Sequence, residues 1–282
     1  NKYMNIYGVD PSKNLGKVNK KKGHKIFCDY FGNKFIKKFM SKIGRPEIII
    51  ANNVIAHIPD INDFCSSLYH ILSDRGICII EFHYLIELIS KNAFDTIYHE
   101  HHFYHSLYVL NKILLKNNLK IFDFEKISTH GGSLRIFITK YVNHKINVKA
   151  KLLKQIDYEL EKGIDNINFY KSFNKKIKVY KSKFEKSFSK ILKSNKKIYG
   201  YGAAAKSCTF IHYMKIENHL QAVYDNNLYK QGKYIPNTGI RIKSPKEIIV
   251  DKPDVIIVFI WNRLQSKKGP NFGALFGLNL YF

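Results

Sequence analysis

Ile48-Ile49-Ile50-Ala51 is a short apolar run, and Ile77-Cys78-Ile79-Ile80-Glu81-Phe82 is a second one farther along the chain. Two more strand-like segments precede them, at 6–9 and 26–28, and longer polar-faced segments separate the four. Short apolar runs that alternate with such segments are typical of a parallel sheet with crossover helices. The sequence therefore predicts a doubly wound α/β unit in its first part.

Residues that commonly begin or end helices lie between these strands. Ser12 can cap a helix after the first strand, and Gly23 can end it. Asp60 or Asn62 can cap a second helix that runs to Leu72. These signals support the predicted alternation of strands and helices.

The rest of the chain predicts more of the first sheet, then a helical segment, then a second α/β pattern. Leu107, Leu110 and Leu114 recur at helical spacing, and so do Leu153, Ile156, Leu160 and Ile164 within a lysine-rich stretch. The further predicted strands are 120–124, 134–141, 196–201, 220–224 and 254–260. We therefore predict an α/β region over 1–145, a helical connector over 146–195 and a second α/β region over 196–282.

The composition is that of a globular protein without a membrane span. Of the 282 residues, 45% are hydrophobic and 14% aromatic, and no apolar run approaches the ~18 residues that cross a bilayer. The formal charge of +25 comes from lysines spread along the whole chain, as in a compositional bias, and no nucleic-acid recognition motif accompanies them. We expect no membrane or nucleic-acid partner, but a general attraction for anionic substrates.

The four cysteines, Cys28, Cys65, Cys78 and Cys208, form no CxxC pair. Their spacing argues against a disulfide framework and against a zinc site, so we expect a cytoplasmic protein with no metal in this chain. The first residue is Asn1 and a strand-like stretch follows almost at once. We expect the natural start to lie upstream.

Polar and aromatic residues follow the first three predicted strands. In an open parallel sheet ligands bind beyond the carboxyl ends of the strands. Asp10 ends the first strand, where a carboxylate can accept both hydroxyls of an adenosine ribose, and two rings after the second strand could flank an adenine. The residues after the second and third strands are Asp29, Tyr30, Phe31, Asn52, Asn53 and His57. Taken singly, each can also be a helix cap or a turn residue.

The segment Phe94-Asp95-Thr96-Ile97-Tyr98-His99-Glu100-His101-His102-Phe103-Tyr104 has the richest chemistry. If it is helical, Tyr98, His101, His102 and His105 share one face, which is compatible with general acid–base chemistry or with a metal site. The metal interpretation lacks a clear additional carboxylate or cysteine ligand. Solvated surface histidines are the other alternative.

A further candidate segment is the glycine turn Thr129-His130-Gly131-Gly132-Ser133-Leu134-Arg135. Its glycines permit a ligand to approach the backbone closely, and its side chains include hydroxyl and guanidinium groups. Such groups can hold a phosphate or a sugar. An ordinary hairpin turn is the alternative.

Gly200-Tyr201-Gly202-Ala203-Ala204-Ala205-Lys206 follows a predicted strand and opens a predicted helix, and Asp225 ends the next strand. This arrangement nearly meets the dinucleotide fingerprint, in which backbone N–H groups at a helix amino end bind a diphosphate. Both a nicotinamide dinucleotide and a nucleotide-sugar contain a diphosphate that could bind there, so both ligands remain open.

At these segments the chain resembles the S-adenosylmethionine-dependent C-methyltransferases of nucleotide-linked deoxysugar biosynthesis. The resemblance covers nearly the whole chain to about Asn262, and it also includes Tyr229-Lys230-Gln231-Gly232-Lys233-Tyr234-Ile235-Pro236. It implies a Rossmann-like methyltransferase domain over 1–145, incomplete at its amino end, and a second Rossmann-like domain over 196–282 that helps hold the nucleotide-sugar.

Parts of the family pattern are not in this chain. The zinc-binding amino-terminal domain and the glycine-rich donor loop are missing, and the residues from Gly269 to Phe282 depart from the family pattern. We expect the chain to be incomplete, with zinc only in the missing domain.

The resemblance also implies roles for individual residues. His101 is the base that removes a proton beside a keto group, while His57, Tyr98 and Glu100 orient it or stabilise the enolate. Carbon 3, beside a 4-keto group, is the family's usual methyl acceptor. The implied S-adenosylmethionine ligands are Asp10, Asp29, Tyr30, Phe31, Asn52 and Asn53, and the implied sugar and diphosphate ligands are Ser133, Arg135, Lys206 and Lys230.

Two alternatives to the methyltransferase remain open. The first is an NAD(P)-dependent nucleotide-sugar oxidoreductase that uses the segment from Gly200 to Asp225. The second is a noncatalytic nucleotide-sugar-binding remnant.

Overall fold

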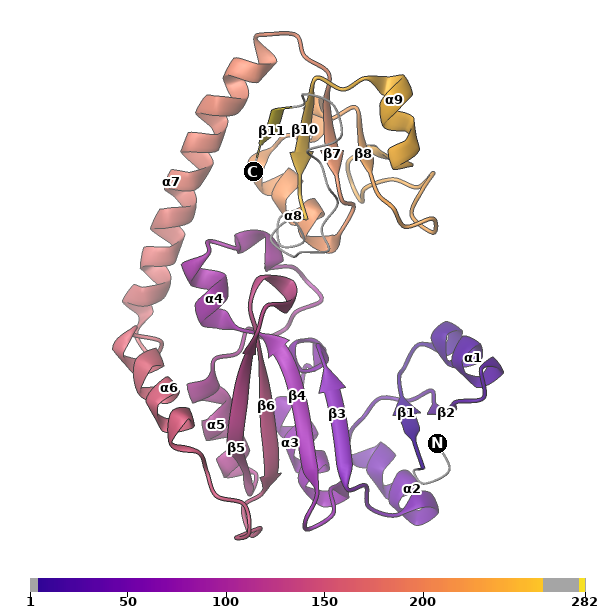
Figure 1. The fold of residues 1–282 in the computed structure, drawn as a ribbon, viewed down its shortest axis with the longest axis vertical. Helices are drawn as coiled ribbons and strands as arrows, with labels where there is room; N and C mark the ends of the chain where they lie inside the picture. The colour runs from indigo at the N-terminus through magenta and orange to yellow at the C-terminus, as the bar shows by residue number, and fades with distance from the viewer. Residues whose placement is uncertain (1–4, 261–278, 282) are drawn as a thin grey trace. The chain divides into compact units, whose positions relative to one another are not determined.

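The structure is a computed structural model, and it describes residues 5–260 and 279–281. The chain forms two compact α/β units (Figure 1). Unit 1 comprises Asn1–Phe82, His102–Lys126 and Leu134–Glu159, and unit 2 comprises His83–His101, Ile127–Ser133 and Leu160–Phe282. The predicted α/β class is confirmed. The units do not follow the order of the chain, because two segments from its first half belong to unit 2, so the predicted domains 1–145, 146–195 and 196–282 stay a prediction.

Unit 1 contains most of the elements predicted from the first part of the sequence. They are β1 (Tyr7–Val9), α1 (Lys13–Lys21), β2 (Lys25–Phe27), α2 (Asn33–Ile43), β3 (Ile48–Asn52), η1 (Ile55–His57), α3 (Ile61–Ile71), β4 (Ile77–His83), α5 (Leu107–Lys116), β5 (Leu119–Ile127), β6 (Ser133–Lys140) and α6 (Ala150–Glu161). The backbone N–H of Leu15 donates to the Ser12 side chain, as predicted. Asp60, and not Asn62, caps α3, because its carboxylate accepts the N–H groups of Asn62 and Asp63.

The prediction that the first strands build one sheet is wrong. β1 and β2 pair in parallel as a two-stranded sheet, and a separate four-stranded sheet has the order β3-β4-β6-β5. Among the described strands β3 lies at the edge of this sheet beside β4, and its Ile48 and Ile50 are 61% and 64% exposed. The aromatic side chains of β1 and β2 pack instead on α2, where Phe35 and Phe39 are buried.

α6 buries a polar side chain, and one residue of its apolar pattern is exposed. Leu152 and Glu159 are buried, whereas Leu153 is 58% exposed. The reason is the carboxylate of Glu159, which accepts the backbone N–H groups of Leu107 and Tyr108 at the start of α5. This polar contact orients α6.

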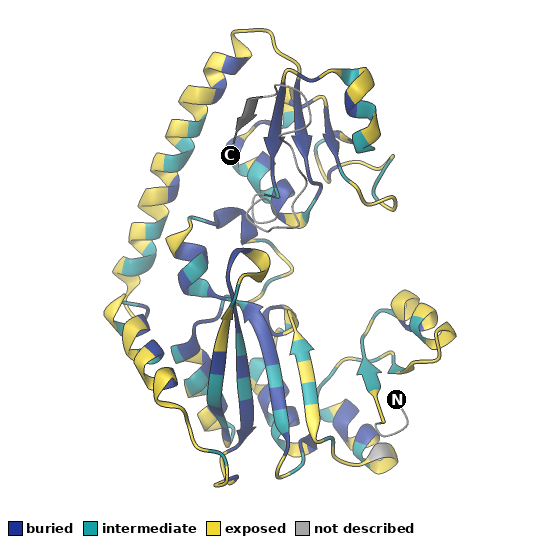
Figure 2. Cartoon of the chain, in the orientation of Figure 1, coloured by how far each residue is buried: buried dark blue, intermediate teal, exposed yellow. Residues whose placement is uncertain are grey.

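Unit 2 is built on a five-stranded parallel sheet of order β11-β10-β7-β8-β9. Its elements are α4 (Leu85–Ser90), η2 (Phe94–Thr96), η3 (Thr129–Gly131), α7 (Ile167–Leu192), β7 (Ile198–Tyr201), α8 (Ala205–Met214), η4 (Glu217–His219), β8 (Ala222–Tyr224), β9 (Arg241–Lys243), η5 (Pro245–Glu247), α9 (Ile248–Asp251), β10 (Val255–Val258) and β11 (Asn279–Tyr281). The residues of β7, β8 and β10 are all buried, as their dark blue colour in Figure 2 shows.

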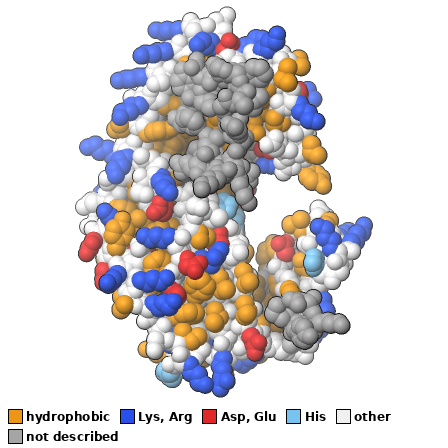
Figure 3. Space-filling model, viewed as in Figure 1, with side chains coloured by type: hydrophobic (Ala, Val, Ile, Leu, Met, Phe, Trp, Pro, Cys, Tyr) orange, Lys and Arg blue, Asp and Glu red, His pale blue; other side chains and the backbone are white. Residues whose placement is uncertain are grey.

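The long helix α7 is exposed along much of its length and contributes Ile177, Phe188 and Ile191 to the core of unit 2 (Figure 2). Lysine and arginine side chains lie along it and recur across the face shown in Figure 3, rather than gathering in one stripe. Among the described helices, none combines the length and the apolar character that crossing a membrane requires.

Candidate active site

Asp10 lies directly after β1 in unit 1. Its Oδ1 accepts a hydrogen bond from the backbone N–H of Ser12 at 2.7 Å, and its own N–H donates to the Phe27 carbonyl at 3.0 Å. Among the described residues, no hydrogen bond engages Oδ2 of Asp10. The carboxylate is therefore held in place by its neighbours and keeps one oxygen for a ligand.

The residues after β2 differ in what they can offer a ligand. Asp29 accepts the N–H of Tyr30 at 2.8 Å, and the Tyr30 ring is 77% exposed. The Phe31 ring packs on Phe64 with centroids 5.4 Å apart, so it belongs to the core beside α2 and α3. Tyr30 is the ring that is open to a ligand.

β3 ends at Asn52, and Asn53 follows it; both residues are exposed. Asn53 has φ 54°, a left-handed conformation that asparagine tolerates better than most residues, and its N–H donates to the Glu81 carbonyl at 2.7 Å. His57 ends η1 and is exposed. These residues also belong to unit 1.

Residues 98–105 are not helical, so the shared face that a helix would give Tyr98, His101, His102 and His105 does not form. After the short helix η2, the chain leaves helical geometry. The buried ring of Phe94 holds this segment to unit 2, because it packs on Tyr213 with centroids 4.9 Å apart. The Thr209 hydroxyl of α8 also donates to the Ile97 carbonyl at 3.5 Å.

Of the four predicted side chains, the structure brings Tyr98 and His101 together in unit 2. Their ring centroids lie 4.3 Å apart, and the backbone N–H of His101 donates to the backbone carbonyl of Tyr98 at 3.1 Å. Glu100 is exposed in the same turn. His102 and His105 belong to unit 1. Within the described ranges no three His, Cys, Asp or Glu residues are arranged to hold a metal ion.

The glycine turn before β6 is held to the start of α4. The Tyr84 N–H donates to the Gly132 carbonyl at 3.2 Å, and a Cβ on Gly132 would lie 2.8 Å from the side chain of Glu87. Gly132 also has φ 136°, so glycine is needed here on both counts. Ser133, which the sequence assigns to substrate, donates its hydroxyl to the Thr129 carbonyl at 3.0 Å.

Arg135 lies on β6 in unit 1, between two carboxylates. Its guanidinium contacts Glu81 and Glu125, each at 3.2 Å, and the side chain of Glu81 is only 8% exposed. This arrangement gives Arg135 a structural role in the sheet, and its predicted role toward a diphosphate stays a prediction.

The loop between β7 and α8 is supported by its own neighbours. Asp225 accepts the Ala203 N–H at 2.7 Å, and Lys230 Nζ donates to the Ala203 carbonyl at 2.7 Å. Lys206, in the first turn of α8, is 8% exposed. The strand–loop–helix arrangement predicted for this motif is confirmed, and the loop binds Asp225 directly.

Sequence reasoning missed His83, the last residue of β4. Burial, followed by the charges of His130, His101, Lys206 and Lys91, lowers the pKa of its imidazole to about 4. The signal that could have found His83 is its position, because it follows Phe82 at the carboxyl end of a parallel strand, where ligands bind.

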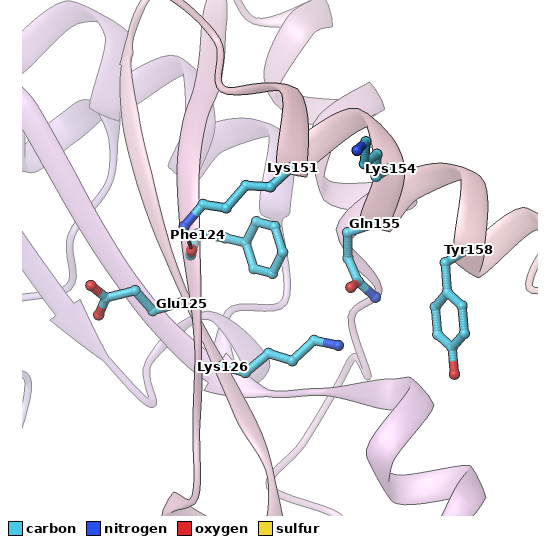
Figure 4. Close-up of a pocket in the computed structure, with 7 residues that line it drawn as sticks. All are labelled: Phe124, Glu125, Lys126, Lys151, Lys154, Gln155 and Tyr158. Atoms are coloured by element: carbon cyan, nitrogen blue, oxygen red, sulfur yellow. Dashed lines mark hydrogen bonds between the residues drawn. The ribbon is translucent and has the colours of Figure 1, made fainter.

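A hollow of about 670 Å³ lies elsewhere in unit 1, between β5 and α6 (Figure 4). Its lining residues are Phe124, Glu125, Lys126, Lys151, Lys154, Gln155 and Tyr158. None of them is a predicted site residue, so the candidate site is not this hollow.

Residues 128–267 match the family model of the C-methyltransferase C-terminal domain. The chain is also 27% identical over 259 residues to the C-methyltransferase NovU of Streptomyces niveus, an alignment that covers 91% of this chain and 61% of NovU. The chain thus spans about three fifths of the length of that relative.

Solved methyltransferases are more distant. One is an S-adenosylmethionine-dependent methyltransferase of Clostridium acetobutylicum, with a TM-score of 0.37 and 12% identity over 49% of this chain and 76% of the other. Another is an O-methyltransferase of a Brevibacillus brevis polyketide synthase, solved with S-adenosyl-L-homocysteine, with a TM-score of 0.38 and 12% identity over 57% and 66%. Similarity at these TM-scores is too slight to bear on function.

Proposed function

We propose that this chain carries the catalytic and sugar-binding parts of an S-adenosylmethionine-dependent C-methyltransferase. Its acceptor is a carbon, carbon 3 in our proposal, of a nucleoside-diphosphate-linked 4-keto-deoxysugar. The observation that carries the proposal is the pairing of Tyr98 with His101 in unit 2, the unit that also contains most of the stretch matched by the C-methyltransferase family model.

The donor-binding residues fit the group that the proposal requires. Asp10 presents a carboxylate oxygen that can accept ribose hydroxyls, and Tyr30 presents an exposed ring to an adenine. When bound, the donor supplies a methyl group on a positively charged sulfur, which is open to attack by a nucleophilic carbon. Asp10, Tyr30 and Asn53 would hold the donor in unit 1.

His101 acts as a general base in the proposed reaction. The keto group acidifies the neighbouring C–H bond, so His101 takes that proton while the bonding electrons move toward the keto oxygen. An unperturbed imidazole, with a pKa near ~6.5, suits this task near neutral pH. The ring of Tyr98 packs beside the base and limits its orientation.

Lysines of unit 2 support an anionic acceptor. Lys206 is buried in the first turn of α8. The partial positive charge of the helix amino end and the charge of Lys206 together favour an anion there. Lys230 lies at the same loop, with its Nζ on the Ala203 carbonyl. We assign Lys206, Lys230 and Ser133 to the sugar and its diphosphate.

Methyl transfer by the full chain tests the proposal. Radiolabelled S-adenosylmethionine and a thymidine-diphosphate-linked 4-keto-6-deoxyhexose are the substrates, and His101→Ala is expected to abolish transfer. Calorimetric titration with S-adenosylhomocysteine should give the same dissociation constant for His101→Ala and for the unchanged chain. The exposed His144→Gln is the matched control and should transfer methyl at the full rate.

The two alternative functions are outcomes of the same experiment. Heat on adding NAD, with none on adding S-adenosylhomocysteine, would make the chain an oxidoreductase. Binding of the nucleotide-sugar without methyl transfer by the full chain would make it a noncatalytic binding protein. Undiminished transfer by His101→Ala would overturn the assignment of the base.

A further inference from the structure

His83 is a half-buried imidazole at the carboxyl end of β4. Among the described residues, none forms a hydrogen bond with its ring. Because no hydrogen bond engages them and they are not fully enclosed, the ring nitrogens of His83 are open to a ligand. Its free ring nitrogens and its place beyond a parallel strand make His83 a candidate ligand-binding group.

Hydrogen bonds link further segments of the unit that contains His83. The glycine turn is joined to the residues after β4 by two hydrogen bonds, from the Tyr84 N–H to the Gly132 carbonyl and from Lys91 Nζ to the Gly131 carbonyl. The segment that bears His101 is joined to α8 through the Thr209 hydroxyl and the Ile97 carbonyl. The base, the glycine turn and the start of α8 are therefore parts of one compact unit.

The charges around His83 are predominantly positive. Those that act on it belong to His130, His101, Lys206 and Lys91, and after burial they lower its pKa. Glu87 lies near the glycine turn, but its carboxylate is 2.9 Å from Lys91 Nζ and is paired there. His83 is accordingly a neutral imidazole near neutral pH, with one N–H to donate and surroundings that favour a negative charge on an acceptor.

We propose that His83 is a further catalytic residue, whose ring N–H donates a hydrogen bond to the keto oxygen of the sugar and stabilises it as an enolate. The role rests on the proposed function. When the C–H bond beside the keto group breaks, its proton passes to His101 and its electron pair forms the C=C bond of the enolate. The negative charge then resides on the oxygen that His83 contacts. His83 does not compete for the proton, because its imidazole is much less basic than an ordinary one.

Deuterium exchange tests this role without methyl transfer. The full chain is incubated in D₂O with S-adenosylhomocysteine and the thymidine-diphosphate-linked 4-keto-6-deoxyhexose, and deuterium at the carbon beside the keto group is followed by NMR. Loss of one oxyanion donor typically costs 10²–10³-fold in rate. We expect His83→Phe to slow exchange at saturating sugar by about 10²-fold or more, with KM changed by less than about threefold, because the lost bond strengthens in the transition state.

His83→Gln separates donation from packing. It keeps an N–H donor near the same place, so it should retain at least about tenfold more exchange than His83→Phe. If His83→Phe exchanges deuterium as fast as the unchanged chain, the role of His83 is overturned while the proposed function stands. Equal losses in both variants, together with a lowered urea midpoint, would make His83 structural and overturn the role as well.

The references are His101→Ala, which should show no exchange above the sugar alone, and the exposed His144→Gln, which should exchange at the full rate. Absence of exchange with the unchanged chain would overturn the proposed function and, with it, the role of His83. If instead the unchanged chain and His83→Phe exchange deuterium equally fast, only the role of His83 is overturned.

Discussion

The carboxylate of Asp225 accepts a hydrogen bond from the backbone N–H of Ala203 at 2.7 Å. This bond ties the loop before α8 to the residue that follows β8. The second oxygen of Asp225 accepts the N–H of Asn227 at 2.8 Å. The acidic residue that a dinucleotide fingerprint assigns to a ribose is here engaged by the protein itself, which disfavours the NAD(P) interpretation.

Asp225→Ala is expected to lower the free energy of unfolding by about 1–3 kcal/mol, because backbone donors in a partly buried loop lose their acceptor. Urea unfolding followed by circular dichroism measures the change. The exposed Asp165→Ala in the same unit is the matched control and should change stability by less than about 0.5 kcal/mol. Equal stability of the two variants would contradict a supporting role for Asp225.

Local signals predicted the order of strands and helices. Ser12 and Asp60 cap the helices that they were expected to cap, and Leu107, Leu110 and Leu114 are completely buried on α5. Each of these features depends on neighbours within one or two turns of the chain. Such features are readable from sequence because period and capping act locally.

Features that depend on distant contacts were not predictable. The histidine spacing after Phe94 suggested a helical face, but burial of the Phe94 ring beside Tyr213 decides that segment's path. In the same way, Leu153 is exposed because Glu159 is recruited to cap α5. His83 looks ordinary in sequence, since the groups that perturb it come from other segments of unit 2.

Arg135→Ala is expected to act on stability as well as on any substrate. It removes the guanidinium beside the buried Glu81 carboxylate, and a loss of about 1–3 kcal/mol in the free energy of unfolding should follow. Thermal unfolding of Arg135→Ala measures it, with the exposed Arg75→Ala as control. An unchanged melting temperature combined with a raised KM for the nucleotide-sugar would instead support the role predicted from sequence.

Glu159→Ala should destabilise unit 1, where the Glu159 carboxylate is completely buried at the start of α5. The N–H groups of Leu107 and Tyr108, 2.9 and 2.7 Å from its oxygens, would lose their acceptor. We expect a cost of about 2–4 kcal/mol in urea unfolding, because one buried and one partly buried backbone donor are left without an acceptor. Glu161→Ala, at an exposed position of the same helix, should cost less than about 0.5 kcal/mol. A similar cost for both would mean that helix propensity, rather than capping, is responsible.

His105 makes the stability of unit 1 depend on pH. Burial lowers the pKa of its imidazole to about 4, against a weaker opposing effect of a hydrogen bond with the Ile55 backbone. In the unfolded chain the ring has its ordinary pKa of about 6.5. Between these values the unfolded state binds the proton and the folded state does not, so stability is present above pH ~6.5 and is lost as the pH falls toward 4. The loss from this one group amounts to at most about 3 kcal/mol.

His105→Phe removes the titration and keeps an aromatic ring against Phe82, whose ring centroid lies 6.0 Å from that of His105. Urea midpoints measured from pH 7 to pH 4.5 should fall less steeply for His105→Phe than for the unchanged chain, whatever the offset at pH 7. His83, with a similarly lowered pKa, keeps part of the slope. His144→Phe, at an exposed position, should leave the slope unchanged. If His105→Phe keeps the full slope, the proton responsible for acid destabilisation binds elsewhere.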